Sequence, residues 1–183
     1  GTFVVKGYLV TVFYLELHSN EWMESDIACD IDMVFHKISL DETVLARDLY
    51  RNVGREWYWA DRYDWSLNQW KDRIYKLNVS LWVMYKDNEP VGYYELELQQ
   101  NDDVEVSYFG LLPGSVGQGF GKYMLVDAFR RSFNDLEASR IWLHTCTLDH
   151  PRALSNYQSR GMRIYKKESD IQYIPDGWDL PTH

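Results

Sequence analysis

The chain has 183 residues, of which 45% are hydrophobic and 26% are charged, a balance that is ordinary for a folded protein of one domain. Its 28 acidic and 19 basic residues give a formal net charge of -9, which disfavours non-specific binding to a nucleic-acid backbone. No apolar run approaches the length of a membrane span, the first residues show no signal-peptide pattern, and two distant cysteines indicate neither a disulfide framework nor a zinc site, so we expect a cytoplasmic protein that binds neither nucleic acid nor a membrane.

The N-terminal half predicts one strand and two helices. Residues 8–17 are rich in β-branched and aromatic side chains, which favours a strand, and the polar stretch 18–32 favours a loop. Helical spacing of apolar residues predicts helices at 39–54 and 66–77. The connection at 55–65 holds five aromatic side chains. An aromatic plug over the core is the commoner explanation for that density, and a substrate-facing loop is the alternative.

The hydrophobic period becomes strand-like after the second helix. Residues 80–98 predict two strands joined by a turn, and residues 103–112 predict a third strand of the same meander. The remaining elements expected are a helix over 117–134, a strand over 140–146, a short helix within 149–161 and a last strand over 162–168. The crossover through the first of these helices should be right-handed, with parallel strands on either side. From Ser169 on, the polar tail either docks through Trp178 or is loose.

Three glycines alternate with other residues at the expected start of the longer helix, at Gly117, Gly119 and Gly121. Their spacing fits neither a Walker loop nor the dinucleotide fingerprint, which argues against both nucleotide-binding folds. A helix start nevertheless exposes unpaired amides at the positive end of the helix dipole, and glycine lets a phosphate approach them. Residues 117–122 therefore predict a pyrophosphate cradle. A tight turn that needs glycine only for its backbone geometry is the alternative.

Two segments, VEVSYFGLLPGSVGQGFGKYML and IWLHTCTLDHPRALSNYQSRGM, together resemble the GNAT superfamily of acyl-CoA-dependent N-acetyltransferases. In that family a loop written Gln/Arg-x-x-Gly-x-Gly/Ala opens a helix and binds the CoA pyrophosphate. Gly119 and Gly121 match this loop, and Val116 replaces its Gln/Arg. A second family block reads Asn-x-x-Ala-x-x-x-Tyr-x-x-x-Gly-Phe. Three of its five positions match, because His150 replaces the Asn and Met162 replaces the Phe.

The resemblance implies an α/β fold of mixed α+β character. Its central sheet would be mixed and mostly antiparallel, with one splayed parallel strand pair, and helices would flank it. The chain would form a single domain, with an acceptor side at 1–80, an acyl-CoA-binding core at 81–168 and a tail at 169–183. The co-substrate implied is acetyl-CoA, with no metal, and the reaction is direct attack on the thioester by a primary amine of a small molecule or peptide.

The resemblance also implies which residues bind the cofactor. The strand before the loop, with Gly110 as a plausible bulge, would bond to pantetheine in the gap, and the acyl carbonyl would lie near the amide of Leu111 or its neighbour. The expected cofactor contacts are Phe109, Gly110, Leu111 and Leu112 on the strand, Val116, Gly117, Gln118, Gly119, Phe120, Gly121 and Lys122 in the loop, and His150 and Asn156 beyond it. Helix capping for His150 and an exposed polar position for Asn156 are the alternatives.

Two residues are candidates for proton transfer. Tyr157 matches the tyrosine of the second block, which faces the CoA sulfur in the family, and a phenol stays protonated at neutral pH. Packing of its ring on the sheet is the alternative. Glu105 is the candidate base because it precedes Gly119 by fourteen residues, as in the histone acetyltransferase branch, and alternation separates it from Val104 and Val106. A solvated carboxylate, with a water chain acting as base, is the alternative.

Four further residues near these segments have simpler interpretations. His144 is expected to be structural or to line the cleft, and Cys146 to be a small buried residue rather than a nucleophile. Glu95 and Glu97 share one face of a strand, where they are either a plain solvated pair or a contact for a cationic substrate. Residues 1–103 carry 19 acidic and 10 basic side chains, which favours a cationic acceptor, although solubility explains the same excess.

Two functions from different classes remain open at this point. One is an N-acetyltransferase. The other is a non-catalytic acyl-CoA-binding or regulatory module that has kept the pocket, and the departures at Val116 and His150 give it weight. An edge strand near the C-terminus makes a homodimer a reasonable expectation.

Overall fold

The structure is a computed structural model that describes residues 5–24 and 32–178. Cys29, Pro181 and residues 25–31 of the expected loop lie outside the described residues.

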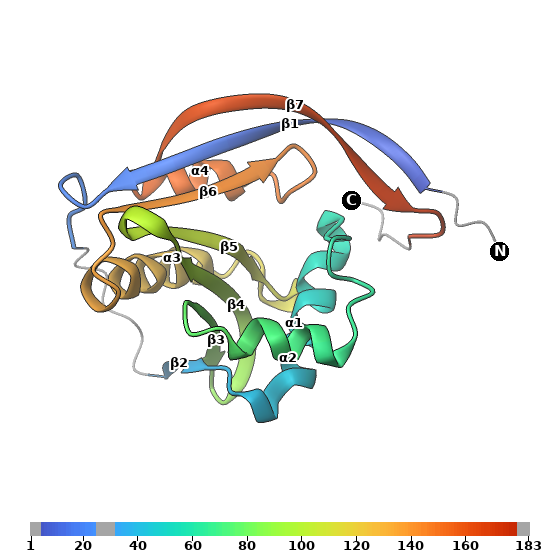
Figure 1. The fold of residues 1–183 in the computed structure, drawn as a ribbon, viewed down its shortest axis with the longest axis horizontal. Helices are drawn as coiled ribbons and strands as arrows, with labels where there is room; N and C mark the ends of the chain where they lie inside the picture. The colour runs from blue at the N-terminus through green and yellow to red at the C-terminus, as the bar shows by residue number, and fades with distance from the viewer. Residues whose placement is uncertain (1–4, 25–31, 179–183) are drawn as a thin grey trace.

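One seven-stranded sheet runs through the molecule in the order β2-β3-β4-β5-β6-β1-β7 (Figure 1). Its strands are β1 (Val5–His18), β2 (Met33–Lys37), β3 (Val79–Lys86), β4 (Glu89–Leu98), β5 (Asp103–Leu111), β6 (Arg140–Cys146) and β7 (Arg163–Pro175). All neighbouring strands are antiparallel except β5 and β6, which are parallel. The mixed, mostly antiparallel sheet with one parallel pair is therefore confirmed.

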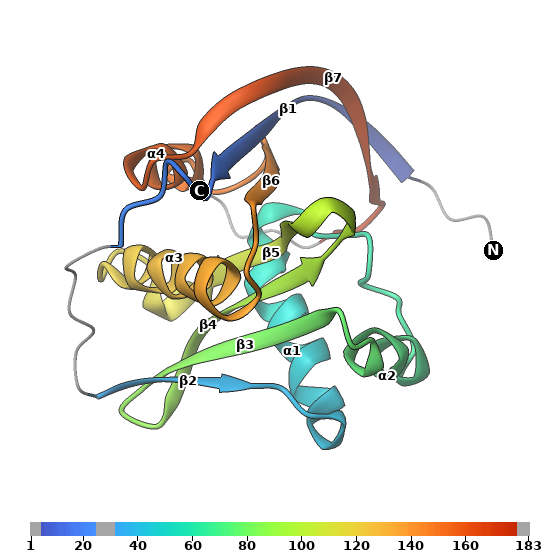
Figure 2. The ribbon, with the colours of Figure 1, turned by 60° about the vertical axis from the view of Figure 1, so that its left-hand side comes forward.

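Helices cover both faces of the sheet (Figures 1 and 2). On one face lie α1 (Thr43–Gly54) and α2 (Leu67–Tyr75), and on the other lie α3 (Phe120–Arg130) and α4 (Ala153–Ser159). Alternation along the strands feeds both cores: Val83 and Tyr93 pack with α1 and α2, whereas Met84 and Tyr94 pack with α3. We call these the α1 face and the α3 face of the sheet.

Several expected boundaries were wrong. The strand β2 lies in a stretch that was not assigned, and a 3-10 turn (Leu40–Glu42), capped by Ser39, precedes α1. The helix expected from residue 117 begins at Phe120, because two loop glycines have positive φ. A π-helical turn (Arg131–Asp135) then follows α3.

The polar tail expected from Ser169 is mostly strand. Its first seven residues complete β7, which pairs with β1 from Glu16↔Arg163 to Val5↔Pro175. Trp178 then docks, as its indole Nε1 donates a 2.8 Å hydrogen bond to the carbonyl of Arg55. β1 and β7 together form a long arched ribbon above the rest of the sheet (Figures 1 and 2), and β7 is an edge strand.

Candidate active site

The parallel strands β5 and β6 separate soon after they meet. Their register contains three pairs and ends at Glu105↔Trp142. Beyond that pair β5 stays with β4, up to Gly92↔Leu111, while β6 stays with β1, up to Val12↔Cys146. The sheet therefore opens into a V-shaped gap, as the sequence resemblance implied.

The bulge that accompanies this gap lies at Ser107 and not at Gly110. The β4–β5 register shifts between Glu95↔Tyr108 and Leu96↔Val106, which leaves Ser107 as the extra residue. Gly110 is in regular register, and it is glycine for another reason. A Cβ there would lie 2.5 Å from Cγ1 of Val53 on α1, so no side chain fits.

Unpaired backbone amides face the gap from β5. The amide of Leu112 donates to the carbonyl of Val91 over 2.8 Å, which places it on the β4 side. Hydrogen bonding alternates along an antiparallel strand, so the amides of Leu111 and Phe109 point to the opposite side, from which β6 has diverged. Leu112 is consequently not available to a ligand through its amide, whereas Leu111 is.

The glycine loop lies between β5 and α3 and leaves its backbone bare. A short 3-10 turn (Pro113–Ser115) leads into it, and Gly117 and Gly119 have φ of +85° and +82°. Glycine is needed at both positions because L residues are strained in this region. Gly121 is helical, and a Cβ there would meet Nδ2 of Asn156 at 3.5 Å. The loop thus presents the amides at the start of α3 without side chains over them.

A cavity of about 1020 Å³ joins the strand gap to this loop. Of the predicted site residues, those that line it are Glu105, Phe109, Gly110, Leu111, Val116, Gly117, Gly119, Gly121, His150, Asn156 and Tyr157. Four others do not line it: Leu112, Gln118, Phe120 and Lys122. Phe120 packs into the core of the α3 face, and the side-chain amide of Gln118 donates to the carbonyl of Gly114 over 3.1 Å.

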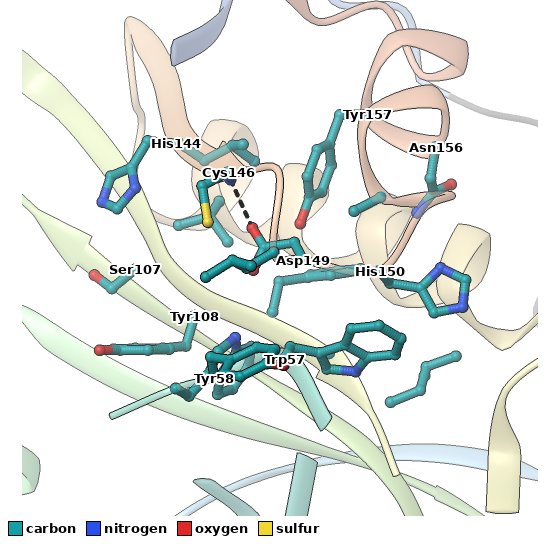
Figure 3. A pocket seen from close by; sticks show the side chains of 18 of the residues that line it. Trp57, Tyr58, Ser107, Tyr108, His144, Cys146, Asp149, His150, Asn156 and Tyr157 are labelled. Atoms are coloured by element: carbon teal, nitrogen blue, oxygen red, sulfur yellow. Dashed lines mark hydrogen bonds between the residues drawn. The ribbon is translucent and has the colours of Figure 1, made fainter. Parts of the chain in front are cut away.

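Tyr157 projects from α4 into the cavity (Figure 3). Its ring is buried and packs edge-on against Phe109, with 5.8 Å between the ring centres. Burial raises the pKa of Tyr157 well above the ordinary phenol value, and the nearby carboxyl of Asp149 adds to the rise. The side chain is therefore a neutral hydroxyl at neutral pH and can donate a hydrogen bond.

Asp149 is a partly buried carboxyl at the start of the segment 149–161, for which the sequence predicted only a short helix. Its Oδ2 accepts the amide of Cys146 at 2.9 Å and also the hydroxyl of Thr145. It does not cap α4, whose N-cap is Arg152. Figure 3 shows Asp149 between Cys146 and Tyr157. Burial raises the pKa of Asp149, and burial followed by the charge of Asp149 raises the pKa of the Cys146 thiol, so this cysteine stays protonated and weakly nucleophilic.

Glu105 faces the cavity at the vertex of the gap, on the α1 face. Burial raises the pKa of its carboxyl, the charge of Glu97 adds to the rise, and His144 opposes it. One of its oxygens accepts a 3.0 Å hydrogen bond from the side-chain amide of Gln99. His144 is exposed and lines the cavity, as expected for a cleft residue.

Glu95 is neither solvated nor open to a substrate, so both expectations for it were wrong. Its side chain is fully buried and accepts two hydrogen bonds from Arg62, at 2.7 and 2.9 Å, and others from Arg73. Arg62 in turn lies 4.5 Å from the ring centres of both Trp65 and Tyr108. This network forms a fixed wall of the cavity on the α1 face.

One side of the cavity, which we call the acceptor side, is lined by the aromatic connection at 55–65 and by the β1–β7 ribbon. Trp57, Tyr58 and Trp65 line it from the connection, and Tyr14 lines it from β1. The substrate-facing alternative for the connection thus applies to part of it. The remaining carboxylates here are Asp61 and Asp170.

The chain matches the model of the acetyltransferase (GNAT) family over residues 43–162, and it therefore belongs to this family. No curated protein matches it in sequence.

Among solved structures, a functionally unknown conserved protein from Staphylococcus epidermidis is 17% identical with a TM-score of 0.64, covering 90% of this chain and 62% of that one. A GCN5-related N-acetyltransferase from Kribbella flavida is 15% identical with a TM-score of 0.62, covering 91% and 58%. A spermidine N-acetyltransferase from Vibrio cholerae, in complex with CoA and spermine, is 19% identical with a TM-score of 0.62, covering 80% and 96%. The chain thus spans between half and two thirds of the first two proteins.

Two further features bear on the class of site. Within residues 5–24 and 32–178, no cluster of His, Cys, Asp or Glu side chains is arranged to hold a metal ion. The helices in this same part of the chain are too short or too polar to cross a membrane.

Proposed function

We propose that this protein transfers an acetyl group from acetyl-CoA to a primary amine of a small molecule or a protein. The observation that carries the proposal is the single cavity in which the unpaired β5 edge meets the bare start of α3. Membership of the acetyltransferase family supports acetyl transfer. The cavity could hold the diphosphate of the donor at the glycine loop and its pantetheine arm along β5.

The residues present fit acetyl-CoA. A Cβ at Gly117 would meet nothing within 4 Å, so open space lies above the backbone where the diphosphate would bind. The amides at the start of α3 favour an anion there. Apart from the amide of Leu111, which the acyl oxygen would occupy, the backbone groups that β5 turns toward the gap would bond to the pantetheine arm as a neighbouring strand does. Val116 replaces the family's Gln/Arg, yet the loop retains its backbone donors.

The thioester supplies an activated carbonyl, to which the amine nitrogen bonds as the carbon–sulfur bond breaks. The amide of Leu111 is placed to stabilise negative charge that develops on the acyl oxygen. Glu105 accepts the proton that the amine loses, directly or through a water molecule. The hydroxyl of Tyr157 gives its proton to the departing sulfur.

These contributions have different expected sizes. Placing the amine and thioester together in one cavity contributes roughly 7–11 kcal/mol to lowering the barrier. Proton transfer by a positioned side chain contributes about 10²–10⁴-fold in rate. Loss of either proton-transfer residue should therefore slow the reaction without abolishing it.

The acceptor side favours a cation. On the acceptor side of the cavity, Arg62 and Arg73 form ion pairs with Glu95, whereas Asp61 and Asp170 add negative charge. Aromatic rings beside these carboxylates suit an ammonium group as well. The spermidine N-acetyltransferase from Vibrio cholerae, which shares this fold, binds spermine. We therefore propose a positively charged amine as the acceptor.

A thermal-shift titration with acetyl-CoA, followed by an amine panel monitored by free-thiol release, tests the proposal. Stabilisation by acetyl-CoA together with thiol release that depends on one amine supports acetyl transfer. Stabilisation without thiol release from any amine supports the alternative of a non-catalytic binding module. Absence of stabilisation at millimolar acetyl-CoA contradicts both.

A further inference from the structure

Two carboxylates face each other across β4 and β5 at the vertex of the gap. Glu97 is the register partner of Glu105, and both side chains lie on the α1 face. Directly opposed like charges destabilise a sheet unless something lies between them. Here the side-chain amide of Gln99 does so, since its Nε2 donates to Oε2 of Glu97 at 2.9 Å and to Oε1 of Glu105 at 3.0 Å.

The orientation of this amide is fixed by Trp142. The indole Nε1 of Trp142 donates a 2.9 Å hydrogen bond to Oε1 of Gln99. An indole N–H can only donate, so the oxygen of the amide must face Trp142 and its NH₂ group must face the carboxylates. Trp142 is also the register partner of Glu105 in the last pair of the parallel ladder. The arrangement therefore lies where the two strands part.

This arrangement makes the two carboxylates unequal. Glu97 is held further by Arg73, whose NH1 lies 3.1 Å from its Oε1. Glu105 uses only Oε1, and its Oε2 has no hydrogen-bond partner among the residues that the structure describes. Because Glu105 lines the cavity, Oε2 is the atom left to accept a proton.

The pKa values of Glu97 and Glu105 are shifted in opposite directions, which agrees with their unequal hydrogen bonding. Burial pushes the pKa of Glu97 up, but hydrogen bonds from Gln99 and Arg73 outweigh it and lower the pKa. For Glu105 burial dominates and raises the pKa, with His144, Gln99 and Arg73 opposing and Glu97 adding. Divergent environments in a carboxylate pair assign different roles to its members.

We propose that Gln99, oriented by Trp142, is a positioning residue that selects Glu105 as the base and directs its free oxygen into the cavity. This inference rests on the proposed function for the role of Glu105, but the hydrogen-bonded arrangement can be tested without it. Glu97 remains a negative charge whose position is fixed by Gln99 and by Arg73 on α2.

Carboxyl-carbon NMR of protein labelled at glutamate provides the test that needs no activity. The Glu105 signal is assigned by its loss in Glu105→Gln and then titrated in the parent, in Gln99→Met and in Trp142→Phe. Gln99→Met removes the donor at nearly constant length, and Trp142→Phe frees the amide to turn. A hydrogen bond to a carboxylate favours its charged form, so both variants should raise the titration midpoint of Glu105 by about one pH unit.

The matched control is Gln100→Met, an exposed glutamine at the next position. It should leave the midpoint where the parent has it. An unchanged midpoint in both Gln99→Met and Trp142→Phe would overturn the proposal. Should one of the two variants unfold, the other carries the same expectation, because each removes the arrangement from a different element.

The kinetic test uses the amine found by thiol release. The acidic limb of kcat/KM should move upward by about one pH unit in Gln99→Met, and the variant should have no further effect when Glu105 is already Gln. Equal losses from Gln99→Met in both backgrounds would show that Gln99 acts elsewhere. Absence of turnover in the parent counts against acetyl transfer alone, because the NMR midpoints still decide the positioning role.

Discussion

Replacing Gly121 with leucine tests the diphosphate position, because the loop of the family has only glycine or alanine at this place. Gly121 is the second residue of α3, and its backbone is helical. The added Cβ would lie 3.5 Å from Nδ2 of Asn156 and 4.0 Å from Cδ1 of Leu111, which are ordinary contacts. Leucine is a better helix former than glycine by roughly 0.5–1 kcal/mol. The variant should therefore be at least as stable as the parent without ligand.

With ligand the leucine side chain should be costly. It lies beside the amide that a phosphate oxygen would approach, and we expect at least a tenfold weaker Kd for acetyl-CoA, which is about 1.4 kcal/mol. At a ligand concentration 100 times the parent Kd, stabilisation should fall from about 2.7 to about 1.4 kcal/mol. For a chain of this size each kcal/mol corresponds to roughly 2–4 °C in Tm. Differential scanning fluorimetry resolves this halving of the ligand-induced shift.

Gly114→Leu is the matched control, because Gly114 lies in the same loop and a Cβ there meets nothing within 4 Å. It should retain the full ligand-induced shift. Gly119 is a poorer choice, since its φ of +82° strains any L side chain and would weaken the fold itself. A parental shift in Gly121→Leu would mean that the ligand does not approach this backbone, and the placement of the diphosphate would be wrong.

Three other substitutions give distinct readouts. Tyr157→Phe should lower kcat by about 10²-fold or more with little change in the KM for acetyl-CoA, and an unchanged kcat would remove its role as acid. Because burial raises the pKa of Glu105, kcat/KM should rise with pH through that raised value, and a pH profile of Glu105→Gln that keeps this limb would identify another base. Glu95→Gln should destabilise the protein by about 3–5 kcal/mol, because buried Arg62 loses its charged partner and Arg73 keeps only Glu97, whereas exposed Glu89→Gln on the same strand should be neutral. Urea unfolding of the two variants measures the difference, and equal midpoints would contradict the reasoning.

The glycine loop and the second family block were predictable because their signals are local. Gly117 and Gly119 need positive φ within one turn, and the helical spacing of α3 follows directly. The separation of the two parallel strands was predicted only from the family resemblance. Nothing in the spacing of residues 103–112 indicates where β5 and β6 stop pairing. The bulge at Ser107 depends on the β4 register, which no local pattern encodes.

The features that were missed depend on segments far apart in the sequence. Residues 169–175 carry polar and apolar side chains alike, and they become strand because β1, more than 150 residues earlier, supplies the partner. Glu95 alternates with Glu97 as residues on a solvated face do. It is buried because Arg62 and Arg73 arrive from the aromatic connection and from α2. A charge pattern on one strand cannot reveal a partner on another element.

The contacts around Glu95 also connect the two functional parts of the cavity. In order from the vertex of the gap, the hydrogen-bonded side chains are Glu105, Gln99, Glu97, Arg73, Glu95 and Arg62. The first is the proposed base at the vertex of the gap, and the last stacks between two aromatic rings of the acceptor wall. Because each link is a hydrogen bond to a charged group and every one is buried or partly buried, the wall is held at a fixed position relative to the base. An acceptor that binds against this wall is therefore placed with respect to Glu105 by the same network, which joins acceptor recognition to proton removal.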